Sequence, residues 1–225
     1  MTQYSVELEA AGPLAMFARP DTGGTPTSYP VPTWSAAKGI FESIAFLEDG
    51  AAWINPVAVE ICRRRGQTGG VIRYQRYTTN YGGPLRESQL RTGVLPGGNN
   101  MQFFATVVRD ACYRLYGTVV ASNYKPAFNA RHYLKALFDR RLVKQGRCFR
   151  TPCLGWSEFT CSYWGPFRRG QTEVDDAISL PIPSMVRSIW DRAARGIAYA
   201  PCFEQNLEIK NGRLDYRTGP DGVEN

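Results

Sequence analysis

The sequence predicts an α+β protein whose main domain is ferredoxin-like, with the RRM-like element order βαββαβ. Apolar residues alternate with polar ones in several short segments, which indicates strands. In two longer segments apolar residues recur every three or four positions, which indicates amphipathic helices. The order along the chain is strand, helix, strand, insertion, strand, helix, strand. The expected ranges before the final strand are 4–10, 33–49, 52–62, 63–100, 112–120 and 128–145.

A loop rich in glycine and proline separates the first strand from the first helix. In the strand, Tyr4, Val6 and Leu8 share one face and polar residues share the other. Residues 12–32 contain repeated glycines and prolines and should be irregular. Thr33 is suited to cap the helix that follows, because its side-chain oxygen can accept a hydrogen bond from a backbone N–H of the first turn. The apolar stripe of this helix consists of Ala37, Ile40, Phe41, Ile44 and Leu47.

The second strand is followed by a long insertion that has a different composition. Residues 52–62 are rich in strand-forming side chains, but Pro56 lies among them, so we expect a strand with a break or bulge. Residues 63–100 contain an Arg-Arg-Arg run, Gly-Gly pairs and tyrosines, and cannot build a core by themselves. Because insertions of this length are usually functional, we expect a thumb-like hairpin that grips RNA. The alternative is a surface loop with no special role.

The rest of the chain contains the second helix and a smaller C-terminal unit. In the helix, the inward-facing residues are Leu134, Leu137, Phe138 and Leu142, and basic residues face outward. The main domain is expected to cover residues 1–159. Residues 160–225 are expected to form a small β-rich subdomain around a helical piece. The strands of this subdomain are expected near 177–182 and 207–210, and its helix over 183–195.

The composition indicates a globular protein outside the membrane. The chain is 43% hydrophobic and 21% charged, unlike disordered chains, which are more polar and more highly charged. Its N-terminal residues lack the basic and apolar regions of a secretory signal. No apolar run approaches the roughly 20 residues that a membrane span needs. We therefore expect a soluble, cytoplasmic protein with no membrane partner.

Cysteine and histidine usage gives no support for a metal site. The chain has six cysteines at irregular spacings without a C-x-x-C pair, and a single histidine. Structural zinc sites need four such ligands at characteristic spacings. We expect reduced thiols, as is usual in the cytoplasm, and neither a metal nor another cofactor.

The charge balance favours a polyanionic partner. Lys and Arg number 27 against 20 Asp and Glu, and the formal net charge is +7. The basic residues are clustered and mostly arginine, which suits phosphate binding; solvated basic faces are the alternative interpretation. In the insertion, arginines alternate with tyrosines whose rings can stack on unpaired bases.

Three segments carry motifs that occur together in one known family. Residues 12–20, GPLAMFARP, are similar to G-D-Y-A-x-F-T-x-P, and residues 28–44, SYPVPTWSAAKGIFESI, to S-Y-x-V-x-T-x-x-A-x-x-G-I-x-E-x-I. Residues 147–159, RCFRTPCLGWSEF, are similar to Q-C-F-x-x-P-x-L-G-x-x-E-F. Residues 54–57 and 108–113 match further motifs in the same order. With these motifs the chain resembles the CRISPR-associated Cas-five family of subtype I-C (Dvulg), RAMP proteins of a Cascade-type complex.

The resemblance implies a modified ferredoxin-like RAMP domain with two tasks. The first is to hold the 5′ handle of the guide RNA at the base of an interference complex. The second is to cleave the guide-RNA precursor within its repeat, without metal, by attack of a 2′-hydroxyl on the adjacent phosphate. The implied partners are the guide RNA, its precursor repeat hairpin, the other subunits of a type I complex and, through the complex, target DNA.

The family's catalytic residues are matched only in part. They are a Tyr at the end of the first helix and a Lys-His pair at the start of the second, positions that fall on Ala45, Arg131 and His132. Arg131 can neutralise phosphate charge, and His132 can act as an acid or a base near neutral pH. Ala45 cannot transfer a proton, which leaves that role open for Tyr29 or Tyr133. Alternatively, His132 contacts RNA or solvent without taking part in chemistry.

The remaining candidate residues are expected to bind RNA through guanidinium, ammonium or aromatic groups. They are Arg19, Lys38, Arg63, Arg64, Arg65, Arg73, Tyr74, Arg76, Tyr77, Arg147 and Arg150. Two other functions stay open. In the first, the protein is a non-catalytic structural RNA-binding cap of the complex, because Ala45 replaces the family's catalytic tyrosine. In the second, it is an unrelated RNA-binding or metabolic ferredoxin-like protein.

Overall fold

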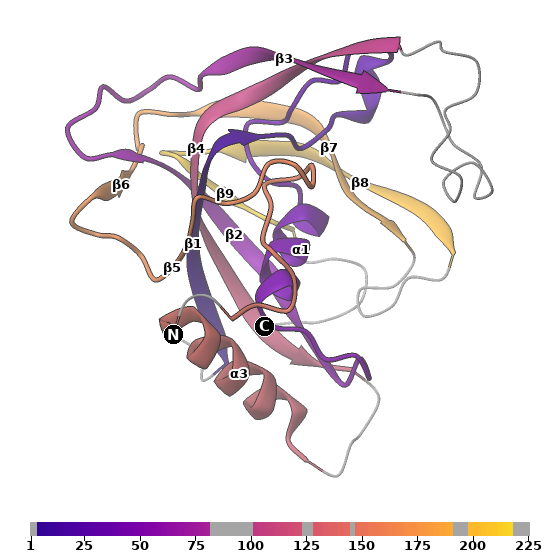
Figure 1. The fold of residues 1–225 in the computed structure, drawn as a ribbon, viewed down its shortest axis with the longest axis vertical. Coiled ribbons are helices and arrows are strands. Elements are labelled where there is room, and N and C mark those ends of the chain that lie inside the picture. Colours follow the sequence, from indigo (N-terminus) through magenta and orange to yellow (C-terminus); the bar gives the residue numbers. More distant parts are fainter. Residues whose placement is uncertain (1–3, 82–100, 123–127, 145–146, 191–197, 218–225) are drawn as a thin grey trace.

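The structure is a computed structural model that describes residues 4–81, 101–122, 128–144, 147–190 and 198–217 (Figure 1). Two helices pack on one face of a large, mostly antiparallel sheet, and a separate two-stranded sheet lies beside them. The expected α+β class is therefore confirmed. The elements are β1 (Ser5–Ala15), a 3-10 turn (Pro20–Thr22), α1 (Trp34–Ile44), β2 (Ala52–Arg64), β3 (Tyr74–Tyr81), β4 (Met101–Ala121), α3 (Ala130–Lys144), β5 (Tyr163–Gly165), β6 (Thr172–Val174), β7 (Leu180–Trp190), β8 (Tyr199–Ile209) and β9 (Arg213–Asp215).

The main sheet has the order β5-β1-β4-β2-β6, and its centre is the long strand β4. In β4, Leu115 is the partner of Leu8 in β1 and of Val59 in β2. All three side chains are buried, as the alternating pattern predicts for the face beneath the helices. The register of β2 shifts between Pro56 and Ala58, which confirms the bulge expected at the proline.

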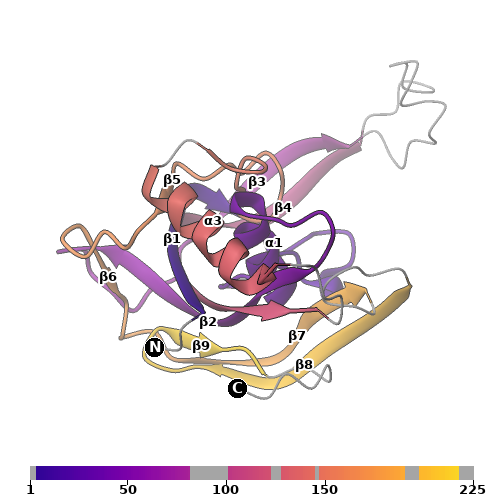
Figure 2. The ribbon, with the colours of Figure 1, turned by 90° about the horizontal axis from the view of Figure 1, so that it is seen from below.

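Helices α1 and α3 lie side by side over this buried face (Figure 2). The predicted cap of α1 is confirmed, because Thr33 Oγ1 accepts a hydrogen bond of 3.2 Å from the backbone N–H of Ala36. The two helices meet at Phe41 and Phe138, whose ring centroids are 5.8 Å apart. Both rings are fully buried, so this pair holds the helices against the sheet.

The β3–β4 hairpin projects from the top of the molecule in Figure 1. It pairs β3 with the first part of β4, from Tyr74 opposite Val108 to Tyr81 opposite Met101. Strand β4 therefore starts well before the predicted residue 112. The alternation is interrupted at Asp110, whose φ of 53° is left-handed, so the sequence pattern shows only the second half of the strand. The remainder of the predicted insertion, 82–100, lies outside the described residues.

The C-terminal part corrects one prediction. Residues 183–190, expected to be helical, belong to the strand β7, which pairs antiparallel with β8. Val186 and Ile189 are β-branched residues, which favour a strand over a helix. Residues 191–195 lie outside the described part. The short strands β5, β6 and β9 join the main sheet, whereas β7 and β8 form their own.

The last two observations concern the cysteines and the length of the helices. All six cysteines are free thiols. Within the described ranges, no helix is long and apolar enough to cross a membrane.

Candidate nucleic-acid interface

A cavity of about 660 Å³ opens where β2 and β3 separate along one edge of β4. Strand β3 pairs with β4 up to Val108, and β2 pairs with β4 from Tyr113 onward. Residues 109–112 of β4 therefore have no partner in either strand. The residues around residue 70 and the loop that carries β5 and β6 form the other walls. Five arginines line the cavity: Arg63, Arg64, Arg73, Arg109 and Arg168.

The arginines at the rim are held by acidic neighbours. Asp110 Oδ2 lies 3.6 Å from Arg73 Nη1 and 3.5 Å from Arg109 Nε, so one carboxylate faces two guanidinium groups. All three side chains are about half exposed. The left-handed backbone of Asp110 marks the point at which β4 passes from β3 to β2. These arginines are accessible to an anion that outcompetes or joins the single carboxylate.

Arg63 lies deeper in the wall. Its Nη1 is 2.6 Å from Glu173 Oε1, and its Nε is 3.8 Å from Asp175 Oδ1. The Nε atom is buried without a hydrogen-bond acceptor among the described residues. A buried donor of this kind costs free energy until it finds an acceptor.

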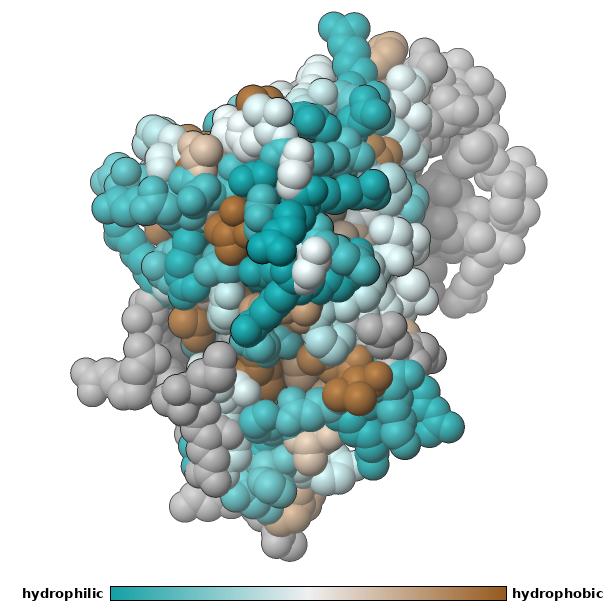
Figure 3. All heavy atoms as spheres, turned by 90° about the vertical axis from the view of Figure 1, so that its left-hand side faces the viewer, coloured by the Kyte–Doolittle hydropathy of each residue, from teal (hydrophilic) through white to brown (hydrophobic). Residues whose placement is uncertain are grey.

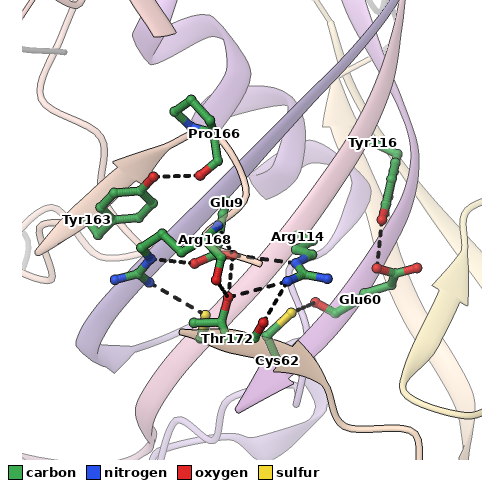
Figure 4. Close-up of polar contacts among 10 residues, drawn as sticks. Glu9, Glu60, Cys62, Arg114, Tyr116, Tyr163, Pro166, Arg168 and Thr172 are labelled. Atoms are coloured by element: carbon green, nitrogen blue, oxygen red, sulfur yellow. Dashed lines mark hydrogen bonds and ion pairs between the residues drawn. The ribbon is translucent and has the colours of Figure 1, made fainter. Parts of the chain in front are cut away.

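A buried ionic network fixes the fifth arginine (Figure 4). The side chain of Glu9 has no exposed surface and lies between two guanidinium groups, 2.6 Å from Arg168 Nε and 3.4 Å from Arg114 Nε. Thr172 Oγ1 donates a third hydrogen bond of 2.7 Å to the same carboxylate. Arg168 also lies over the ring of Tyr163, with 3.8 Å between the guanidinium carbon and the ring centroid. Glu9 thus ties the loop that carries β5 and β6 to the main sheet.

The inner wall of the cavity is uncharged. Burial raises the pKa of the Tyr113 phenol far above its usual value, and its hydroxyl donates to the carbonyl oxygen of Pro30 over 2.8 Å. The pKa of the Cys62 thiol is raised by its contact with Cys112 and by burial. At neutral pH the phenol and the thiol are therefore protonated and uncharged. The positive charge of the cavity comes from its arginines.

The predicted RNA-binding residues of the hairpin fall on β3 or just before it. Tyr74 and Arg76 are exposed, and Tyr74 has 42% of its side-chain surface accessible. Tyr77 instead packs edge-on against Phe159, with ring centroids 4.9 Å apart, and its hydroxyl lies 3.4 Å from Glu158 Oε1. The third family-like motif, residues 147–159, is thereby attached to the hairpin.

The predicted catalytic pair lies elsewhere, at the start of α3. Arg131 and His132 are both exposed, and the guanidinium of Arg131 lies 4.6 Å from the ring centroid of Tyr4. Asn129 caps the helix, accepting from the backbone N–H of His132 over 3.2 Å, and its amide donates to the Tyr4 hydroxyl over 3.4 Å. Tyr133 is also exposed here. The helix start thus presents a cation, an imidazole and two phenols.

The structure does not bring Ala45 to this pair. Ala45 ends α1, is 1% exposed, and lies next to Ile44, whose carbonyl oxygen accepts a hydrogen bond from Arg141. Arg141 is nine residues beyond His132, which corresponds to about 13 Å along α3. The C-terminus of α1 therefore faces the far end of α3. A tyrosine at position 45 is not available to act beside His132 without repacking.

The other predicted site residues are spread over the surface. Arg147 and Arg150 are exposed near the end of α1, where the backbone N–H of Arg150 donates to the carbonyl oxygen of Ser43. Arg19 forms an ion pair of 2.7 Å with Asp21, and Lys38 is paired with Glu42 on α1. Arg65 lies 3.5 Å from Glu173. The side of the molecule that carries β6 is mostly hydrophilic (Figure 3).

Sequence reasoning missed three residues of these sites. Arg109 and Arg168 join Arg63, Arg64 and Arg73 around the cavity, and Tyr4 joins the helix start. Arg109 and Arg168 belong to basic or family-like segments, which was a reason to include them among the candidate RNA-binding residues. Their convergence depends on long-range strand pairing, which local patterns do not reveal. Tyr4 was interpreted only as a core-facing strand residue.

The structure thus defines an α+β protein with an arginine-lined cavity beside its β3–β4 hairpin. A family model described as CRISPR-associated protein (Cas_Cas5) matches residues 5–177. The chain therefore belongs to the Cas5d family of CRISPR-associated proteins, which confirms the resemblance and is consistent with subtype I-C.

Individual relatives agree with this assignment. The chain is 27% identical over 225 residues to a protein of Mannheimia succiniciproducens named CRISPR pre-crRNA endoribonuclease Cas5d, covering 93% of each chain. A solved CRISPR-associated protein superimposes with a TM-score of 0.62 at 17% identity, over 96% of this chain and 93% of that one. A functionally uncharacterized protein of Streptococcus mutans gives 0.56 at 16% identity, over 95% and 92%. The two structures show that the fold is shared.

Proposed function

We propose that the protein binds the repeat and 5′ handle of a guide RNA and cleaves the precursor within the repeat. The observation that carries the proposal is the convergence of five arginines on one cavity beside the β3–β4 hairpin. Arginine clusters of this kind suit phosphate contact. Membership in the Cas5d family and the name of the Mannheimia relative support RNA as the anion and cleavage as the reaction.

We propose a ferredoxin-like interpretation of the main sheet. The elements β1, α1, β2, β4, α3 and β5 follow the order βαββαβ, and β4 lies between β1 and β2 as a split βαβ unit requires. Strand β3, which lies outside this set, belongs to the proposed thumb of the 63–100 insertion. The proposed main domain covers residues 1–159, and its sheet takes its last strand, β5, from the proposed second unit, residues 160–225.

The proposed cleavage needs no metal. A base removes the proton from a ribose 2′-hydroxyl, and the oxygen attacks the adjacent phosphorus. The bond from phosphorus to the 5′-oxygen then breaks, and an acid protonates this oxygen. The products are a 2′,3′-cyclic phosphate and a 5′-hydroxyl. Proton transfer and charge stabilisation are the two forms of catalysis that the protein must supply.

The start of α3 carries groups suited to this reaction. His132 is exposed, and an imidazole can both accept and donate a proton, so it acts as the acid or the base. Arg131 neutralises the phosphate. Tyr4, which is held beside Arg131 by Asn129, supplies a hydroxyl in place of the tyrosine that Ala45 replaces.

As partners we propose the guide RNA, its precursor hairpin and the other subunits of a type I-C interference complex, with target DNA reached through that complex. A second function is favoured by one observation. Ala45 is buried and distant from His132, so the family's catalytic set is incomplete at this position. A non-catalytic RNA-binding cap of the complex would show the same binding without cleavage.

Binding of a labelled repeat RNA is the first test of the proposal. We expect tighter binding to the cognate repeat hairpin than to a scrambled hairpin. Because each neutralised phosphate releases counterions, we expect affinity to fall steeply with salt, with a slope of several units in a plot of log K against log salt. Filter binding over a salt series measures this slope. Absent or salt-insensitive binding would contradict the proposal.

The hairpin is tested by replacing Arg73, Tyr74 and Arg76 together with alanine. We expect weaker RNA binding, because each engaged ring contributes on the order of 1–3 kcal/mol. Tyr77 is left intact, since its ring packs on Phe159. The matched control replaces three exposed residues of like type elsewhere: Arg140, Tyr199 and Lys210. Equal RNA affinity in the two folded variants would assign no role to the hairpin.

A further inference from the structure

We propose that the arginine-lined cavity holds one unpaired nucleotide of the bound RNA, with its base inside and its phosphate at the rim. This inference rests on the proposed RNA-binding function and deepens it. It assigns a ligand to the gap between β2 and β3. The ligand is a single-stranded nucleotide rather than a stretch of duplex.

The size and walls of the cavity fit a base. Its volume of about 660 Å³ lies within the usual range for small-molecule sites, about 300–1,000 Å³. Ile61, Ile72 and Val108 provide apolar surface, and the Tyr113 ring lies among them. Sites of this type combine apolar walls with a few polar groups that fix orientation. A base is flat and largely apolar on its faces, so it matches such walls.

The charges fit a phosphate at the opening. Five arginines line the cavity, and the acids that pair with them are Asp110, Asp175, Glu173 and Glu9, so positive charge remains in excess. Arg73 and Arg109 are about half exposed and share the single carboxylate of Asp110. A phosphate oxygen between them would form charge-assisted hydrogen bonds that a bare base could not form.

One unused hydrogen-bonding group lies within the walls. The Nε atom of Arg63 is buried and lacks an acceptor among the described residues. Base edges carry acceptors that can satisfy such a donor. An entering nucleotide would therefore remove an unfavourable feature of the free protein.

The cavity is also held in shape before RNA binds. Glu9, Arg114 and Thr172 fix Arg168 and its loop from below (Figure 4). A preformed site loses less conformational entropy on binding than one that must order. A paired base cannot enter the cavity, because it remains stacked in its helix. The proposed ligand is thus a nucleotide of the single-stranded part of the RNA.

The test is an abasic scan of the bound RNA. Each nucleotide in turn is replaced by a ribose without a base, so that all phosphates remain. We expect one position, or two neighbouring ones, to lose about 5- to 150-fold in affinity, the range for one stacked base. Ala111→Leu adds bulk to a buried residue that lines the cavity. In this variant we expect the loss at that position to disappear.

A second measurement makes the test independent of whether Ala111→Leu folds. 4-Thiouridine placed at the sensitive position should crosslink to residues 61–62 or 111–113 of the wild-type protein on irradiation. RNA that binds with equal losses at all abasic positions, or crosslinks only outside the cavity, would overturn the inference and leave the proposed function standing. Wild-type protein that does not bind the repeat RNA at all would overturn both.

Discussion

Replacing His132 with alanine is expected to slow cleavage of the repeat RNA by about 10²- to 10⁴-fold, the usual contribution of a positioned acid or base. The affinity for RNA should change little, because one imidazole contributes little beside the arginines that bind a polyanion. The exposed position of His132 on α3 leaves the fold intact. Single-turnover cleavage rates at saturating protein, together with dissociation constants, separate the two effects.

Companion variants on the same helix define the role of each group. Arg131→Ala should lower both affinity and rate, since a guanidinium beside the phosphate stabilises ground state and transition state alike. Tyr4→Phe removes only a hydroxyl and should lower the rate alone. Arg140→Ala, an exposed cation two turns away, is the control and should leave the rate unchanged. Full activity in His132→Ala would show that the catalytic site lies elsewhere.

Removing the carboxylate of Glu9 is expected to reduce the free energy of unfolding by about 3–5 kcal/mol, the typical cost of breaking a buried ion pair from one side. Glu9 has no exposed surface, and its loss leaves Arg114 and Arg168 facing each other without a counter-charge. Urea unfolding of Glu9→Ala measures the effect.

The control for this variant is Glu7→Ala, two residues earlier on the same strand. Glu7 is only partly buried, and a surface substitution of this kind usually changes stability by no more than about 0.5 kcal/mol. Glu9→Gln retains the shape and should lose less than Glu9→Ala. A loss in Glu9→Ala no larger than in Glu7→Ala would show that the network does not stabilise the loop.

Local periodicity predicted most of the main domain. The helix capped by Thr33 and the helix with Phe138 in its apolar stripe are present, because a 3.6-residue pattern defines a buried face without tertiary information. The bulge at Pro56 was equally predictable from the missing backbone N–H.

Other elements depend on partners that are distant in the chain. Most of β7, from Pro183 onward, was expected to be helical, although it forms a strand opposite β8. The full length of β4 was not predicted, because the left-handed Asp110 interrupts the alternating pattern of the strand. The cavity arises because β2 and β3 use one edge of β4, so Arg63, Arg109 and Arg168 meet across more than a hundred residues of sequence. Composition predicted an anionic partner, but only the pairing of these strands shows where the arginines converge.

The central claim is that the protein binds and cuts a guide-RNA precursor, and incubating it with an end-labelled repeat hairpin in EDTA tests this claim most directly. We expect a single cut within the repeat, with a 2′,3′-cyclic phosphate on the upstream fragment and a 5′-hydroxyl on the downstream one. Hairpin that is bound yet stays intact, with or without added Mg²⁺, would contradict the claim and establish the RNA-binding cap.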